Sequence, residues 1–265
     1  MAPLPDPAAG AADWLRPEGL PAEAGALMAS RRGGVSAAPY DSLNLRPPGL
    51  RGDALDAPAA VLENQRRFAA AMEGARPVYL DQVHGSRVVT LTAASTAPGL
   101  PLERADASVT TEPGIACTVL VADCLPVLLA APGGRGVGAA HAGWRGLAGG
   151  VVEACLASLC ERAGCRPADV SAWLGACIGP QRFEVGDEVR AAFGAAGQAC
   201  FNPLPAPGKW LADLPALARL RLAAAGVERV AGGLWCTASE PSRFFSYRRD
   251  GVTGRHAAAI WIRRR

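Results

Sequence analysis

Three side chains with metal-binding or nucleophilic chemistry, His84, Cys124 and His141, have similar surroundings in the sequence. Each follows a short apolar segment typical of a strand, and a glycine or proline comes within two residues of it. Imidazole and thiolate are ligands that zinc prefers, and three protein ligands leave a fourth position open for catalysis. The three residues are therefore a candidate catalytic metal site. The alternative is two buried histidines and an inert thiol, because the long separations match no short metal motif.

Three neighbours of these residues, Gly143, Arg145 and Asp123, add to the chemistry. In "AAHAGWRG", Gly143 allows close backbone approach and Arg145 supplies a planar donor fork at the start of an expected helix, which favours an anion such as phosphate. The alternative is that Arg145 only caps the helix and packs on the sheet. Asp123, directly before Cys124, is a candidate to orient a ligand or to move a proton.

Two polar segments offer further binding groups. "ASRRGGVSAAPYDSLNL" contains Arg31 and Asn44, and "FFSYRRDGVTGRHA" contains Tyr247 and Arg248. Such side chains suit a hydroxylated, aromatic or anionic ligand. The alternatives are a turn-rich loop for the first segment and a hairpin turn for the second.

The elements that must position these residues alternate between strands and helices. A helix is expected over 57–73 with Asp56 as N-cap, and Gly164 ends another that starts near residue 146. Interleaved elements predict an α/β (α+β) layered sandwich, a mixed sheet with helices on the outside. Strands are expected at 25–30, 77–80, 86–92, 170–179, 244–251 and 256–263, with several more within 105–146, and further helices at 186–194 and 213–226.

Composition narrows the class of protein. The 265 residues predict a proline-rich lead-in over 1–24 and one catalytic domain over 25–265. The N-terminus lacks the pattern of a secretory signal, and no apolar run is long enough for a membrane span, so we expect a cytoplasmic protein with no membrane partner. The eight cysteines are then not a disulfide framework. A net charge of +3 with scattered arginines argues against a nucleic-acid partner and favours a small-molecule substrate.

Seven blocks of sequence, in this order, resemble the YfiH-like family, also called multicopper polyphenol oxidase-laccase or purine nucleoside phosphorylase-type proteins. They are "RRGGVSAAPYDSLNL", "LDQVHG", "ADASVTTEPG", "VADCLPVLL", "AAHAGWRG", "IGPQRFEVGDEV" and "FFSYRRDGVTGRHAAAIW". The resemblance implies a bacterial cytosolic α/β sandwich related to certain cysteine hydrolases. It also implies that the zinc ligands are His84, Cys124 and His141, that Arg31 and Asn44 lie at pocket positions, and that the third histidine, His256, is not a ligand.

The resemblance implies phosphorolysis of adenosine, inosine, guanosine and S-methyl-5′-thioadenosine to base plus ribose 1-phosphate, together with adenosine deamination. Zinc would polarise water for attack at purine C6, while Arg145, the following helix and Arg31 would hold phosphate. A multicopper oxidase needs about ten imidazoles, and the chain has three, so copper in the same site would give only weak oxidation of phenols. We expect Arg248 to bind substrate as well, and leave open whether the protein is a monomer or a weak dimer.

Two other functions use the same residues. One is a metal-free cysteine hydrolase, with Cys124 as nucleophile, His141 as base, and an amide or peptidoglycan-precursor substrate. The other is a structural zinc site closed by a fourth ligand, Cys177 or Cys117.

Overall fold

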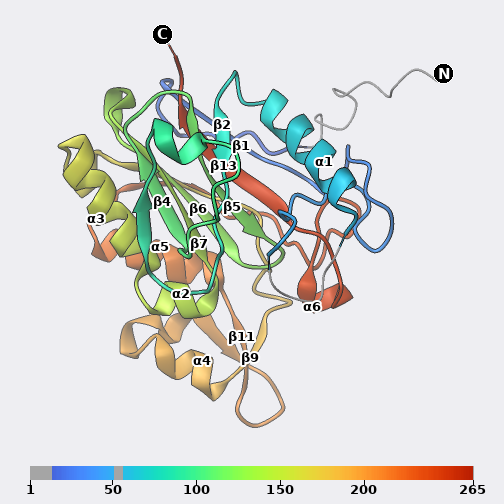
Figure 1. The fold of residues 1–265 in the computed structure, drawn as a ribbon. Coiled ribbons are helices and arrows are strands. Elements are labelled where there is room, and N and C mark those ends of the chain that lie inside the picture. Colours follow the sequence, from blue (N-terminus) through green and yellow to red (C-terminus); the bar gives the residue numbers. More distant parts are fainter. Residues whose placement is uncertain (1–13, 51–55, 265) are drawn as a thin grey trace.

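The computed structural model describes residues 14–50 and 56–264, which form two facing β-sheets with helices on their outer faces (Figure 1). None of the helices in these ranges is long and apolar enough to cross a membrane. The four-stranded sheet has the order β1 (Ala24–Met28), β13 (His256–Ile262), β5 (Ile115–Val121), β2 (Arg76–Val78). The six-stranded sheet has the order β12 (Arg229–Gly232), β8 (Ser171–Leu174), β6 (Leu125–Ala130), β7 (Val137–Ala142), β4 (Ala107–Thr110), β3 (Val88–Thr90).

An apolar layer holds the two sheets together. Val119 of β5 and Ile260 of β13 belong to the same buried cluster as Leu128 of β6 and Ala139 of β7. Strands β5, β6, β7 and β13 are buried along their whole length, which explains their nearly uninterrupted apolar sequence.

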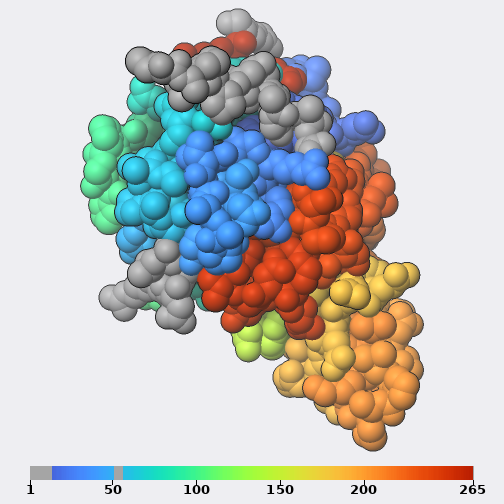
Figure 2. Space-filling view, turned by 90° about the vertical axis from the view of Figure 1, so that its right-hand side faces the viewer, coloured from blue at the N-terminus to red at the C-terminus, as the bar shows by residue number. Residues whose placement is uncertain are grey.

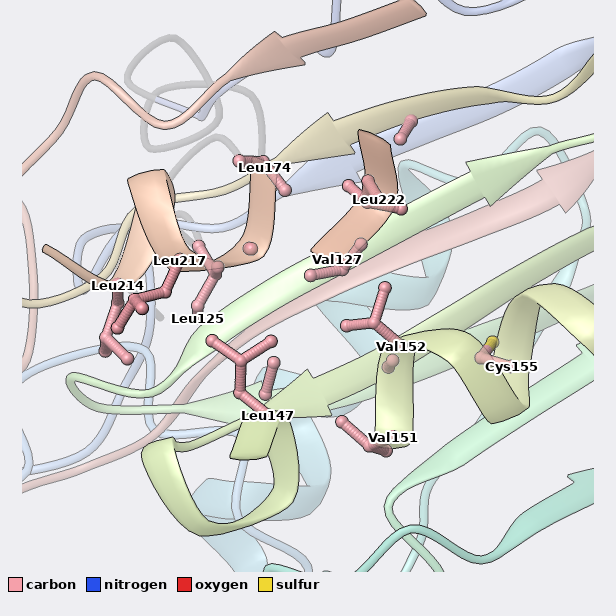
Figure 3. Packing of buried hydrophobic residues seen from close by; sticks show 14 of the residues in the cluster. Leu125, Val127, Leu147, Val151, Val152, Cys155, Leu174, Leu214, Leu217 and Leu222 are labelled. Carbon is pink, nitrogen blue, oxygen red and sulfur yellow. The ribbon is translucent and has the colours of Figure 1, made fainter. Parts of the chain in front are cut away.

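Helices close the outer faces. Helices α3 (Val151–Ala163) and α5 (Leu214–Ala224) cover the six-stranded sheet, where Val127 lies in one cluster with Val152 and Leu222 (Figure 3). Helix α1 (Pro58–Ala70) covers the four-stranded sheet through Phe68, which is in one cluster with Trp261. Full burial of each such side chain contributes about 1.5–3 kcal/mol to the stability of the folded state. The predicted layered sandwich with outer helices is confirmed, and its strands form two main sheets.

A small lobe projects from one end of the sandwich (Figure 2). It contains a three-stranded sheet of β10 (Phe201–Pro203), β11 (Lys209–Ala212) and β9 (Glu184–Gly186), covered by α4 (Asp187–Ala192). Of these elements the sequence predicted only the helix, because strands of three or four residues are too short to show an apolar period.

Several predicted elements need correction. Asp56 is not the N-cap of α1; Ala57 is, and the Asp56 carboxylate instead accepts hydrogen bonds from Ser36 and Asn44. The helix expected over 146–164 is divided into α2 (Trp144–Ala148) and α3, because Gly150 between them has a φ of 85°.

The strand expected over 244–251 is wrong, since α6 (Tyr247–Asp250) begins there. Its N-cap is Ser246, whose hydroxyl accepts the N–H of Arg249.

The expected lead-in packs on the domain where the structure describes it. Leu15 and Met28 exchange two backbone hydrogen bonds, and the buried Trp14 ring lies 5.6 Å from that of Phe68. Residues 1–13 lie outside the described part.

Candidate metal centre and its cavity

Two connections between strands and the end of a third strand bring His84, Cys124 and His141 together. His84 lies between β2 and β3, Cys124 lies in the turn from β5 to β6, and His141 is near the end of β7. Their ligand atoms all lie within 4.8 Å of one another, and Cys124 Sγ is 3.7 Å from His84 Nε2. Ordinary Zn–S and Zn–N bond lengths at a tetrahedral angle place sulfur and nitrogen about 3.6 Å apart. The Cys124–His84 distance and the donor types of all three residues therefore fit zinc.

Asp106, which the sequence analysis missed, anchors both histidines. Its fully buried carboxylate accepts the Nδ1–H of His141 at 2.9 Å and the backbone N–H groups of Val83, His84 and Gly85 at 2.7–3.1 Å. The first bond fixes the His141 ring so that Nε2 is left for a metal. Burial alone would raise the pKa of Asp106, but hydrogen bonds from His141 and Gly85 hold it below its usual value.

Two of the ligands, Cys124 and His141, also shift each other's pKa. Burial would raise the pKa of the Cys124 thiol, yet the charges and hydrogen bonds of His141 and His84 lower it to about 6. Burial would lower the pKa of His141, yet the Cys124 thiolate and Asp106 raise it to about 9. Without metal, Cys124 and His141 therefore form a thiolate–imidazolium pair at neutral pH. Metal binding to His141 must displace a proton.

The backbone around the ligands is sterically demanding. His84 and Asp123 have φ angles of 61° and 97°, a left-handed region that costs non-glycine residues about 1–3 kcal/mol. A Cβ added to Gly143 would lie 2.8 Å from His84 Cδ2 and 2.9 Å from Cys124 Sγ. The φ of Gly143 is an ordinary −63°, so its backbone conformation does not require glycine. Glycine is required there for space, because the side chains of His84 and Cys124 lie directly against it.

A cavity of about 540 Å³ opens onto Cys124 and His141. Its volume is in the range of small-molecule sites. Four arginines and several aromatic and polar side chains line it, among them Arg46, Arg145, Arg248, Arg255, Trp144, Phe183, Tyr247, Asp81, Gln82 and Asp123.

Four of the predicted residues beyond the ligands line this cavity: Asp123, Arg145, Tyr247 and Arg248. The Asp123 carboxylate accepts hydrogen bonds from the Thr237 hydroxyl and the Arg248 N–H, both at 2.6 Å, and so holds the start of α6. Arg145 is exposed and stacks on the Trp144 ring at 4.3 Å. Helix α2 has only five residues, so its dipole adds little to anion binding.

The structure places Arg31 and Asn44 outside the cavity lining. Arg31 forms an ion pair with Asp41 at 3.2 Å and donates to Pro241 O. Asn44 is buried, and its Oδ1 accepts the backbone N–H groups of Arg46 and Arg255, two cavity residues that the sequence analysis did not select. The resemblance block ending in "GRHAAAIW" contains Arg255, but nothing in that pattern distinguishes it from the other arginines.

Fold and site together define an α/β sandwich protein with a small-molecule cavity at a candidate metal centre. Residues 25–263 match the family model described as multi-copper polyphenol oxidoreductase laccase, and the chain belongs to this family.

The names of its relatives give a different activity, that of a purine nucleoside phosphorylase. The chain is 49% identical to a purine nucleoside phosphorylase of Pseudomonas aeruginosa over 94% of its length and 98% of the relative's. It is 46% identical to the purine nucleoside phosphorylase YfiH of Escherichia coli, covering 94% of the chain and 96% of the relative.

A solved structure of YlmD from Geobacillus stearothermophilus is 32% identical to the chain, with a TM-score of 0.86 over 95% of this chain and 96% of that one. A Neisseria meningitidis protein gives 42% identity and a TM-score of 0.85 over 95% and 100%. The predicted membership of the YfiH-like family is confirmed.

Proposed function

We propose that the chain is a metal-dependent purine nucleoside phosphorylase that cleaves adenosine, inosine, guanosine and S-methyl-5′-thioadenosine, and that it also deaminates adenosine. The observation that carries this proposal is the His84–Cys124–His141 set facing an arginine-lined cavity of nucleoside size. The names of the relatives support the same activity.

In phosphorolysis a phosphate oxygen forms a bond to ribose C1′ while the C1′–N9 bond breaks. The electron pair passes to the base, which takes up a proton. Cavity arginines bind the phosphate and hold it against the sugar. Tyr247 and Phe183 offer flat apolar surfaces to the purine. Asp123, with both carboxylate oxygens already bonded, is assigned to positioning Arg248.

A zinc ion held by the three ligands would supply a Lewis acid beside the bound nucleoside. Asp106 keeps the His141 ring oriented and holds the backbone of His84. In deamination, water oxygen replaces the C6 amino group, and ammonia leaves.

The test uses the metal-loaded chain with adenosine. Adenine and ribose 1-phosphate should form only when phosphate is present, and inosine should form without it. Cys124→Ala should abolish both reactions, whereas Cys160→Ala, at a thiol remote from the cavity lining, should leave both intact. If the loaded protein makes neither product, the proposal is wrong.

A second candidate, a metal-free cysteine hydrolase, is favoured by one observation: the Cys124 sulfur lies within 4.8 Å of a ring nitrogen of His141, which lowers the pKa of the thiol. Its activity on an amide or peptidoglycan-precursor substrate should resist chelators and be lost on alkylation of Cys124. Phosphorolysis should instead be lost with the metal, so chelation separates the two functions.

Multicopper laccase chemistry does not fit the sequence, which has three histidines in all. His256, the third, is buried between Phe244 and Phe245. A single copper at the same ligands would give at most a weak side activity toward phenols. A closed structural zinc site is not favoured either, because in the described residues neither Cys117 nor Cys177 belongs to the ligand group.

A further inference from the structure

Arg255 differs from the other arginines of the cavity in how little compensates its charge. It is half-buried, and its side chain donates two hydrogen bonds, both from Nη1, to the backbone carbonyls of Thr253 and Gly254. Its guanidinium lies 6.0 Å from the centroid of the Tyr247 ring, at the outer limit of a cation–π contact. In the described ranges no carboxylate forms an ion pair with it, and the carboxylate of nearby Asp123 is engaged by Thr237 and Arg248. Nε and Nη2 therefore have no hydrogen-bond partner in the described residues, and Arg255 lines the cavity.

A second arginine, Arg46, is held next to Arg255. The buried Asn44 side chain accepts the backbone N–H groups of both Arg46 and Arg255, and Leu45 N donates to Arg255 O. This fixes two cationic residues from opposite ends of the chain on one cavity wall. Burial, and then the charge of Arg46, lower the pKa of Arg255. Arg46 Nη2 donates to Leu50 O at 3.2 Å, so Arg46 contributes its charge to this wall while Arg255 supplies the open donors. An anion at Arg255 would relieve both costs.

The other arginines have competing roles. The guanidinium of Arg248 donates to Glu184 O, Arg145 is exposed and stacked on Trp144, and Arg31 is paired with Asp41 outside the cavity lining. We infer that Arg255, with Arg46, forms the subsite that binds the phosphoryl dianion of the co-substrate. This inference rests on the proposed phosphorolysis, and it assigns phosphate to this wall of the cavity instead of to Arg145 and the start of α2.

The kinetic test measures phosphate and nucleoside KM for the metal-loaded chain and for Arg255→Gln. We expect phosphate KM to rise roughly 10- to 100-fold, as for loss of a charge-assisted donor fork, with nucleoside KM nearly unchanged. Arg255→Lys keeps the charge without the fork and should recover part of the loss. Arg219→Gln is the matched control, because Arg219 also donates to two backbone carbonyls but lies outside the cavity lining.

A binding test separates this inference from the proposed function. Inorganic phosphate should raise the melting temperature of the wild type and Arg219→Gln more than that of Arg255→Gln, at matched ionic strength. This holds even if no nucleoside is turned over. Unchanged phosphate KM and equal stabilisation of all three proteins would overturn the subsite while leaving phosphorolysis in place. If adenosine 5′-monophosphate binds through Arg255 but inorganic phosphate does not, the site recognises the phosphate of a nucleotide. The assignment of the phosphate co-substrate to this subsite is then wrong.

Discussion

At the scale of single residues, the chemistry of the candidate metal centre depends on groups that do not touch the metal position. Asp106 has no exposed surface and takes four hydrogen bonds, three from the loop that carries His84 and one from His141. One carboxylate thus sets the geometry of two ligands that are 57 residues apart in the sequence. Nothing in "RADASVT" reveals this, because the partners of a lone aspartate at the start of a strand are decided by tertiary structure.

Asp106→Asn should lower zinc affinity by roughly 10- to 100-fold, the usual effect of losing the partner that orients a metal-bound imidazole. Chelator competition on the folded protein measures it. Asp213→Asn is the matched control, since Asp213 also accepts a backbone N–H, that of Ala216, but as the N-cap of α5. Equal zinc affinity in the two variants would show that Asp106 does not position the ligands.

His256 gives a prediction about pH. Burial, then Arg255 and Arg31, lower its pKa from 6.5 to about 3, and neither ring nitrogen has a hydrogen-bond partner in the residues described. The unfolded state therefore binds this proton more readily, so stability is lost as pH falls below about 6.5. Between pH 7 and pH 5 the wild type should lose about 2 kcal/mol more free energy of unfolding than His256→Met. Urea unfolding at both pH values tests this, and parallel losses would contradict it.

At the scale of elements, the site depends on how strands pass into turns and helices. The sequence analysis correctly expected apolar strands before Cys124 and His141, because continuous apolar runs bounded by glycine and proline are a strong local signal. It did not find the division at Gly150 or helix α6, since a left-handed glycine and a serine N-cap act only once the flanking segments are in place. Arg31 and Asn44 were selected from a polar loop, whose composition does not tell which side chains face a cavity.

Gly143→Ala tests the passage from β7 to α2. The added methyl group would meet His84 and Cys124 at 2.8–2.9 Å without any change in backbone preference. We expect metal affinity to fall at least tenfold, with a change in unfolding free energy below that of a core substitution, about 2–5 kcal/mol. Gly149→Ala, at the other end of α2, is the control because its added Cβ would contact only backbone oxygens. Equal metal binding in both variants would rule out the steric explanation.

At the scale of the whole molecule, the candidate metal centre lies where the chain passes between the two sheets. His84 is in the connection from β2 to β3, and Cys124 is in that from β5 to β6; each begins in the four-stranded sheet and ends in the six-stranded one. The sequence predicted layers but not this arrangement, because β13 pairs with both β1 and β5, and such long-range pairing leaves no local pattern. A metal at these ligands links both connections to His141 of β7.

Metal removal should therefore loosen a defined part of the molecule. At free zinc 100 times the dissociation constant, binding contributes about 2.7 kcal/mol to stability. Exchange through local opening should quicken on chelation in residues 81–86 and 122–125 and stay unchanged for local opening of α3, which packs in a separate apolar layer. Amides that exchange only by global unfolding, as expected at the centre of β13, should lose just the roughly 2.7 kcal/mol of protection that zinc gives the whole fold. Cys124→Ser should show the fast pattern with or without zinc. Uniform protection by zinc across the chain, or the same response in Cys124→Ser, would contradict a metal that joins the two sheets through these ligands.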